Sequence, residues 1–214
     1  MKKLIGAHLF SLFLLLTLIT SVHASVTMQA IIDQDVCVTF DFKIMNSTIY
    51  RTIYNESLIT GRPIPDIILD NLEQRNLTHA YYDTGPEPIH FDNQTQTIST
   101  TFCLYGSDIL NFTVNTKSMI RTCYVRTDWR KFQVNVTDEI SLDFNEYFGI
   151  PVNLWQRINY TLNGKVHPAY YYNFTGSTLL DPLCYFVLPA DATNVRAVED
   201  TIIFELPPSF EDSM

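Results

Sequence analysis

Apolar and polar residues alternate along much of the chain, which is the pattern of β-strands that bury one face and expose the other. In the clearest run, residues 36–44, the apolar positions alternate with Cys37, Thr39, Asp41 and Lys43. Similar alternation occurs over 98–104 and 140–144, and residues 183–188 and 201–206 are apolar enough for buried or half-buried strands. Thr, Val, Ile, Tyr and Phe are plentiful, and these residues favour strands. The pattern predicts a fold built mainly from short strands.

Two shorter signals refine this picture. Asn163-Gly164 lies between two strand-like stretches, and this dipeptide favours the tight turn of a β-hairpin. Residues 66–75 break the alternation, because they follow Pro65 and place Ile68 and Leu72 four residues apart, as on one face of a helix. The fold class expected from the sequence is therefore mainly β, an antiparallel two-sheet β-sandwich with one short helix at about 66–75.

The first 24 residues have the features of a secretory signal peptide. A basic start, Lys2-Lys3, precedes an apolar run that ends near Ile19, and Ala24 offers the small residue needed for cleavage. The run is shorter than the roughly 20 apolar residues that cross a bilayer comfortably. We therefore expect residues 1–24 to be a cleaved signal peptide, an uncleaved anchor being the alternative. Residues 25–214 are expected to form a single β-rich, glycosylated ectodomain that is secreted and has no membrane span.

Asn-x-Ser/Thr sequons are frequent, and they agree with export because this motif is glycosylated only in the secretory pathway. The predicted glycosylation sites are Asn46, Asn55, Asn76, Asn93, Asn111, Asn135, Asn159 and Asn173. In several of them the middle residue is apolar, as in Asn111-Phe112-Thr113. On a strand, Asn111 and Thr113 would face outward and Leu110, Phe112 and Val114 inward, and the same reasoning applies around Asn135 and Asn159. The sequons and the alternation thus predict that the same side chains point to solvent.

All four cysteines follow the signal peptide, and in an oxidising compartment they are expected to form two disulfides. They are Cys37, Cys103, Cys123 and Cys184. Three pairings are open. Spacing favours Cys103 with Cys123, closing a hairpin-like segment, and Cys37 with Cys184, joining an early strand to a late one. Their wide spacing does not resemble a zinc site, so no metal is expected.

Charge and motifs narrow the functional classes. Without Lys2 and Lys3 the chain has 12 basic and 23 acidic side chains, which disfavours nucleic acid and anionic membranes as ligands. The histidines after the signal peptide are His79, His90 and His167, and none has metalloprotease spacing. A serine-hydrolase elbow and a phosphate-binding glycine loop are also missing from the sequence. We therefore expect neither an enzyme nor a cofactor.

The remaining feature is a basic segment, residues 117–131, between the sequons at Asn111 and Asn135. Its candidate partner-binding residues are Lys117, Arg121, Arg126, Trp129, Arg130 and Lys131. Glycans screen the surface around them, so a sugar-free basic segment with aromatic residues could meet an acidic extracellular or cell-surface protein, or a sulfated glycan. The function expected from the sequence is a secreted binding module that engages an extracellular protein through a glycan-free face. Alternatives are a carrier of a small apolar ligand between aromatic-rich sheets and a secreted hydrolase.

Overall fold

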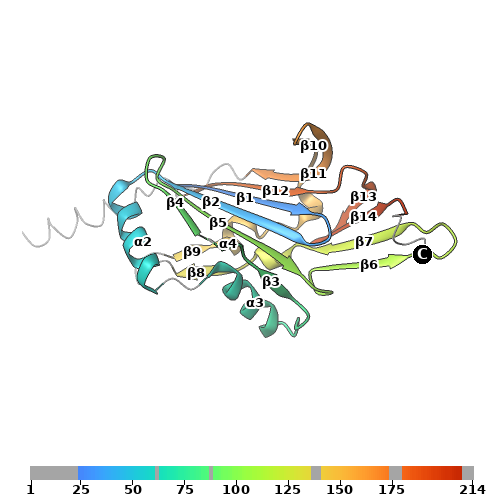
Figure 1. Ribbon diagram of the computed structural model, residues 1–214, viewed down its shortest axis with the longest axis horizontal. Coiled ribbons are helices and arrows are strands. Elements are labelled where there is room, and N and C mark those ends of the chain that lie inside the picture. Colours follow the sequence, from blue (N-terminus) through green and yellow to red (C-terminus); the bar gives the residue numbers. More distant parts are fainter. Residues whose placement is uncertain (1–23, 61–62, 87–88, 136–140, 174–179, 209–214) are drawn as a thin grey trace, which may run out of the picture.

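Two β-sheets pack face to face in the computed structural model, which describes residues 24–60, 63–86, 89–135, 141–173 and 180–208 (Figure 1). The large sheet has eight strands, in the order β10 (Gln156–Leu162), β11 (Lys165–Asn173), β12 (Leu180–Val187), β1 (Ala24–Ile32), β2 (Val36–Ile44), β5 (Thr97–Tyr105) and β3 (Tyr81–Asp83), with β4 (Ile89–Asp92) also paired to β5. The small sheet has the order β13 (Thr193–Val198), β14 (Thr201–Leu206), β7 (Arg121–Arg126) and β6 (Leu110–Val114). A separate pair is formed by β8 (Gln133–Asn135) and β9 (Ser141–Asp143). The predicted β-sandwich is confirmed.

In the view of Figure 1, one helix lies at the left end of the sandwich, a second lies below it and a third lies near its middle. They are α2 (Ser47–Thr60), α3 (Ile64–Gln74) and α4 (Phe144–Phe148), with single turns of 3-10 helix at η1 (Asp128–Arg130) and η2 (Val152–Leu154). The predicted helix is α3. Among the described residues, no helix combines the length and the apolar character needed to cross a membrane.

One strand pairing departs from the all-antiparallel prediction. Strand β1 lies between β2, to which it is antiparallel, and β12, to which it runs parallel from Ala24 beside Leu180 to Ile31 beside Val187. The parallel pair joins segments far apart in the sequence. Pairing between such distant segments cannot be derived from local hydrophobic patterns, because alternation gives a strand's faces but not its neighbours.

The core lies between the two sheets and follows the predicted alternation. Val36, Val38 and Phe40 of β2 are fully buried, whereas Cys37 and Thr39 on the opposite face are only partly so. The same alternation holds over β5, where Phe102 and Leu104 are buried. Aromatic rings fill the middle of the core in edge-to-face and stacked contacts, made by Phe40, Phe132, Phe144, Phe148, Phe186, Trp129 and Trp155. Burial of this apolar surface is the main stabilising contribution.

The Asn-Gly hairpin is confirmed. The sequence predicts that sequons point outward from strands around Asn111, Asn135 and Asn159, and the full pattern is seen around Asn159. Asn163 and Gly164 both have positive φ, 50° and 77°, as a tight turn between β10 and β11 requires. On β10, Asn159 and Thr161 are exposed while the intervening Tyr160 is partly buried. The side chain of Asn135 lies outside the described set.

Strand β6 differs from the prediction. Phe112 pairs with the buried Cys123 and so lies on the core-facing side of the small sheet, but its side chain is 53% exposed. Val114 is exposed as well. The β6–β7 hairpin extends past the end of the large sheet, so no other strand or helix of the described chain lies over this face there (Figure 1).

Candidate binding surface

The basic segment does not form one surface. Lys117 is exposed in the turn between β6 and β7, and the Arg121 guanidinium lies 4.9 Å from the centre of the Phe112 ring. Arg126 forms an ion pair with Asp128 at 3.2 Å. Trp129 and Arg130 are buried, with 1% and 0% exposure, so their predicted role in contacting a partner is wrong. These two side chains belong to the core because η1 turns inward between the sheets.

Arg130 instead joins three chain segments: its own turn at Thr127, the stretch from Phe148 to Ile150, and Asp200. Its Nε donates a hydrogen bond to the carbonyl of Phe148 at 2.8 Å, and its Nη1 donates to the carbonyl and hydroxyl oxygens of Thr127 at 2.6 and 2.9 Å. Its Nη2 donates to the carbonyl of Ile150 and to the Asp200 carboxylate, both at 2.7 Å. The five N–H groups of a guanidinium are all satisfied in this way. The ring of Trp155 lies against the guanidinium, 4.9 Å from its carbon.

Asp200 is the anion that pairs with the positively charged side chains of this cluster. Lys131 donates to its second carboxylate oxygen at 2.6 Å, so Lys131 is engaged within the fold as well. Burial acts to raise the pKa of Asp200, but hydrogen bonds from Lys131 and Arg130 and their charges outweigh it, and the pKa lies below its usual value. Asp200 is therefore ionised at neutral pH and balances the buried guanidinium.

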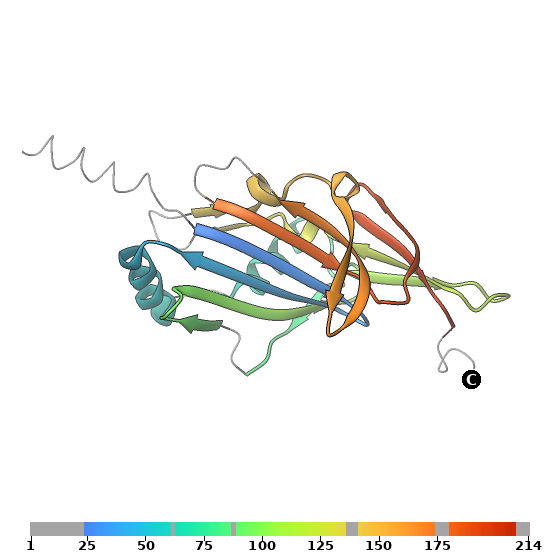
Figure 2. The same cartoon turned by 90° about the horizontal axis from the view of Figure 1, so that it is seen from above.

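The face of the large sheet turned away from the core is open. We call the outward-facing side chains of β1, β2 and β5 the outer face; no helix or second sheet of the described chain lies over its middle (Figure 2). It consists largely of hydroxyl-bearing and acidic residues in register across the strands. Thr39 lies opposite Thr101, with their hydroxyl oxygens 3.2 Å apart, and the Ser99 hydroxyl donates to Asp41 at 2.6 Å.

At the end of the outer face nearest α2, a shallow depression of about 360 Å³ opens between these strands and β4. It is lined by Ser25, Thr27, Asp41, Lys43, His90, Asp92, Thr95, Thr97 and Ser99. Asp92 accepts hydrogen bonds from the hydroxyl of Thr95 and from the backbone N–H groups of Gln94 and Thr95, which lower its pKa. The depression is therefore polar, and its Asp92 carboxylate is ionised at neutral pH.

The outer face and the elements that border it are together acidic. The adjoining β1–β2 turn contributes Asp35, β2 contributes Asp41, and the neighbouring strands β3 and β4 contribute Asp83 and Asp92. Lys43 is the basic residue of the outer face and these bordering elements.

Tyrosines border the outer face at two places. The rings of Tyr81 and Tyr105 stack 5.6 Å apart, and both are more than 40% exposed. On β10, β11 and β12, the rings of Tyr160, Tyr171 and Tyr185 form a second cluster, joined to β1 by a 3.0 Å hydrogen bond from Gln29 to the Tyr160 hydroxyl. Burial and the neighbouring tyrosines raise the pKa of Tyr185. Tyrosine offers both apolar area and a hydrogen-bonding hydroxyl to a partner.

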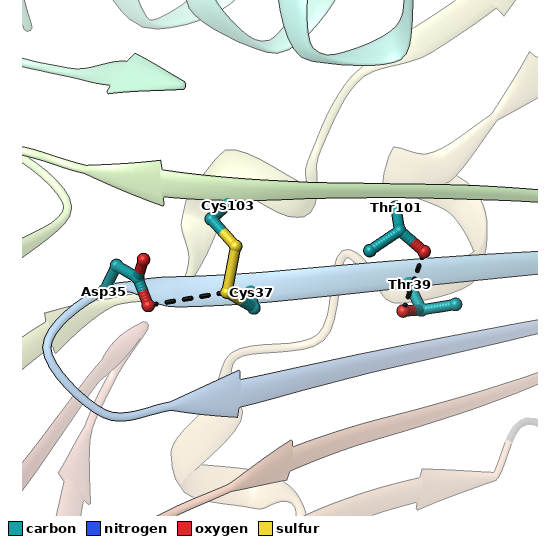
Figure 3. Close-up of a disulfide and its surroundings, with 5 residues drawn as sticks. All are labelled: Asp35, Cys37, Thr39, Thr101 and Cys103. Carbon is teal, nitrogen blue, oxygen red and sulfur yellow. Dashed lines mark hydrogen bonds between the residues drawn. A yellow bond between two sulfur atoms is a disulfide. The ribbon is translucent and has the colours of Figure 1, made fainter. Parts of the chain in front are cut away.

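A disulfide crosses the outer face between Cys37 and Cys103, which lie directly opposite each other on β2 and β5 (Figure 3). The pairing favoured by spacing, Cys103 with Cys123 and Cys37 with Cys184, is therefore wrong. Cys123 and Cys184 are buried free thiols, and burial raises the pKa of both. An Asp35 carboxylate oxygen lies 3.4 Å from Sγ of Cys37. A disulfide sulfur has no proton to donate, so this is a van der Waals contact and not a hydrogen bond. The two sulfurs are also not available as thiolate ligands, so Asp35, Cys37 and Cys103 do not form a metal site.

The sequons surround the outer face without entering it. Asn55, Asn76, Asn93, Asn111, Asn159 and Asn173 are exposed, and Asn46 is half-buried at the start of α2, where its Oδ1 accepts the backbone N–H groups of Thr48 and Ile49. Asn93 lies in the β4–β5 turn, Asn159 on β10 and Asn173 at the end of β11. Strands β1, β2 and β5 carry no sequon.

Sequence reasoning did not select the residues of the outer face. Thr39, Asp41, Ser99 and Thr101 are the polar positions of alternating runs, and such positions are usually treated as ordinary solvent-facing residues. A usable signal was present, because these runs are long and free of sequons in a chain that has sequons in most other regions.

Comparisons of the chain with protein-family models, with curated protein sequences and with solved structures found no match. The functional argument therefore depends on the geometry of the surface.

Proposed function

We propose that this protein is a secreted, N-glycosylated binding module that holds a basic extracellular protein against the outer face of its large sheet. The observation that carries the proposal is that β1, β2 and β5 present an uncovered surface whose strands carry no sequon, and that the bordering β1–β2 turn, β3 and β4 make this surface acidic. Three adjacent strands of nine residues, with β3, β4 and β12 beside them, span on the order of the 800 Å² per partner that a stable interface needs.

Charge decides the kind of partner. The cations of the basic segment are largely engaged within the fold, by Asp128 and Asp200. On and beside the outer face, Asp83 is exposed, and Asp35, Asp41 and Asp92 are partly exposed. A positively charged partner would be steered toward this surface and a negatively charged one repelled. The acidic partner and the sulfated glycan expected from the sequence are thus less well supported than a basic protein.

The two alternatives have less support. A carrier needs space between the sheets, but stacked and edge-to-face rings such as Phe40, Phe132 and Phe144 occupy the middle of the core. A hydrolase needs an activated nucleophile. Ser99 lies opposite His90 in the β4–β5 pairing, but its hydroxyl donates a hydrogen bond to Asp41 and not to an imidazole.

Export and glycosylation are tested by expressing the full chain in animal cells. We expect protein in the medium that begins at Ser25 and whose glycopeptides show sugar at the exposed sequons. Enzymatic removal of the sugars should reduce a diffuse, heavy band to about 22 kDa, at about 115 Da per residue. Intact mass spectrometry and N-terminal sequencing provide the check. A sugar-free product, or one retained in the cytosol, contradicts the proposal.

The binding face is tested by moving one sugar. Ser99→Asn creates the sequon Asn-Thr-Thr in the middle of the outer face, and Lys117→Thr creates Asn115-Thr-Thr at the tip of the β6–β7 hairpin. Each variant adds one glycan, so the pair is matched in mass and processing. We expect the wild type to bind strongly basic secreted proteins and not acidic ones in biolayer interferometry at physiological salt. Ser99→Asn should abolish binding because a glycan blocks close approach, and Lys117→Thr should preserve it.

Loss of the Asp41 hydrogen bond is a separate consequence of Ser99→Asn, so Ser99→Ala serves as its control. Ser99→Ala removes the same hydrogen bond without adding sugar and should bind as the wild type does. If Lys117→Thr abolishes binding while Ser99→Asn leaves it intact, the hairpin tip and not the outer face is the contact, and the proposed surface is wrong.

A further inference from the structure

Each sheet of a sandwich ends in strands whose outer N–H and C=O groups can pair with another chain. Native proteins protect such edges with very short strands, bulges, charges or proline. In this protein the ends of the sheets are β10, β3 and β4 for the large sheet and β13 and β6 for the small one. These edges differ in how they are protected.

Two edges have ordinary protection. Strands β3 and β4 have only three and four residues, which is too short to template a new strand. Strand β13 contains a register shift between Thr193 and Arg196, so a bulge interrupts its edge, and Arg196 adds an exposed charge there. Neither strand carries a sequon.

Strand β6 has none of these devices. Its sequence, Leu-Asn-Phe-Thr-Val, has no charge, proline or glycine, and Phe112 and Val114 are exposed. Uncharged segments of high β-propensity on an exposed edge are prone to pair with other chains. The strand does contain the sequon of Asn111. The Asn111 Oδ1 accepts the Phe112 backbone N–H at 2.7 Å, so the amide group that would take the sugar lies against the strand backbone.

Strand β10, at one end of the large sheet, is likewise an edge strand that contains a sequon. It is seven residues long and has one charged side chain, Arg157, whose guanidinium is directed to the carbonyl of Val195 at 3.0 Å. That charge is therefore held against the small sheet. Asn159 and Thr161 are exposed, so the sequon again occupies the unprotected edge.

We infer that the glycans at Asn111 and Asn159 guard the open edges of the two sheets against strand addition by a second copy of the chain. A glycan is bulky and strongly hydrated, and a neighbouring backbone cannot come to the roughly 4.8 Å needed for a ladder beside it. The inference rests on the glycosylation included in the proposed function, but not on the binding face.

The experiment removes the edge sequons and compares them with one that is not on an edge. Thr113→Ala and Thr161→Ala each abolish a sequon while keeping the asparagine, and Thr78→Ala does the same for Asn76, after the end of α3. Size-exclusion chromatography with light scattering of the secreted protein should show a several-fold loss of monomer to oligomers for the Thr113→Ala/Thr161→Ala variant. Thr78→Ala should remain as monomeric as the wild type. Equal monomer content in all three overturns the inference.

A second measurement separates edge protection from a role of the sugars in folding. Folded wild-type protein is trimmed with an endoglycosidase that leaves one sugar on each asparagine, because complete enzymatic removal converts Asn to Asp and places a charge on the edge. We expect trimmed protein to associate with time and with concentration, and an unchanged monomer counts against the inference. Glycopeptide analysis distinguishes the two ideas: empty Asn111 and Asn159 refute both their glycosylation and the edge role, empty sites at every sequon refute the glycosylation in the proposed function, and occupied sites with no change in association refute only the edge role.

Discussion

Arg130→Met is expected to lower the free energy of unfolding by about 3–5 kcal/mol, the cost of breaking a buried and fully hydrogen-bonded ion pair. Methionine fills a similar volume but leaves the carbonyls of Phe148, Ile150 and Thr127 without their donor and the Asp200 carboxylate without one of its two cationic partners. Denaturant unfolding followed by tryptophan fluorescence measures the change, since Trp155 stacks on the guanidinium.

Arg126→Met is the matched control for this prediction. Arg126 pairs with Asp128 through a side chain that is 38% exposed, so its loss should cost less than about 1 kcal/mol. If Arg130→Met behaves like Arg126→Met, then Arg130 does not hold the three segments together.

Removing the disulfide should have an effect of similar size. In the double variant Cys37→Ala/Cys103→Ala, release of a cross-link between residues separated by 66 positions is expected to cost about 4 kcal/mol, chiefly because the unfolded chain regains conformational freedom. The paired strands on either side of the disulfide remain hydrogen-bonded, so the fold should persist in the absence of denaturant. Chemical denaturation of the variant and of the wild type provides the comparison.

The neighbouring cross-strand pair provides the control. Thr39→Ala/Thr101→Ala alters the next outward-facing positions of the same two strands and should cost at most about 1 kcal/mol. Thiol titration in denaturant without reductant should give two thiols in the wild type, from Cys123 and Cys184. Four titrated thiols, or a Cys-to-Ala double variant as stable as the threonine control, would show that Cys37 and Cys103 are not joined.

Local sequence patterns were sufficient where a strand or turn is determined by its own residues. The alternation over 36–44, the Asn163-Gly164 turn and the helix after Pro65 all appear in the structure. Helix α2 was missed, because its β-branched and aromatic residues favour strands in isolation. Asn46, whose side chain accepts two backbone N–H groups of its first turn, was the available signal for its start.

Errors elsewhere arose from contacts between distant segments. The run over 140–144 does not continue as a strand, because Asp143 ends β9 and accepts the backbone N–H of Asn145 at the start of α4. Residue 140 itself lies outside the described set. The cysteine pairing depends on the register of β2 and β5, and the burial of Arg130 depends on carbonyls supplied by α4 and η2. Spacing along the chain contains none of this information.

The parallel contact between β1 and β12 has a consequence for biogenesis. Strand β1 precedes the other described strands in the chain, yet one of its two neighbours begins at Leu180, so its second edge stays unpaired until most of the chain has been synthesised. Such long-range closure slows folding and leaves an apolar ribbon accessible in the interim. We therefore expect chaperones that shield nascent strands to increase the yield of folded protein.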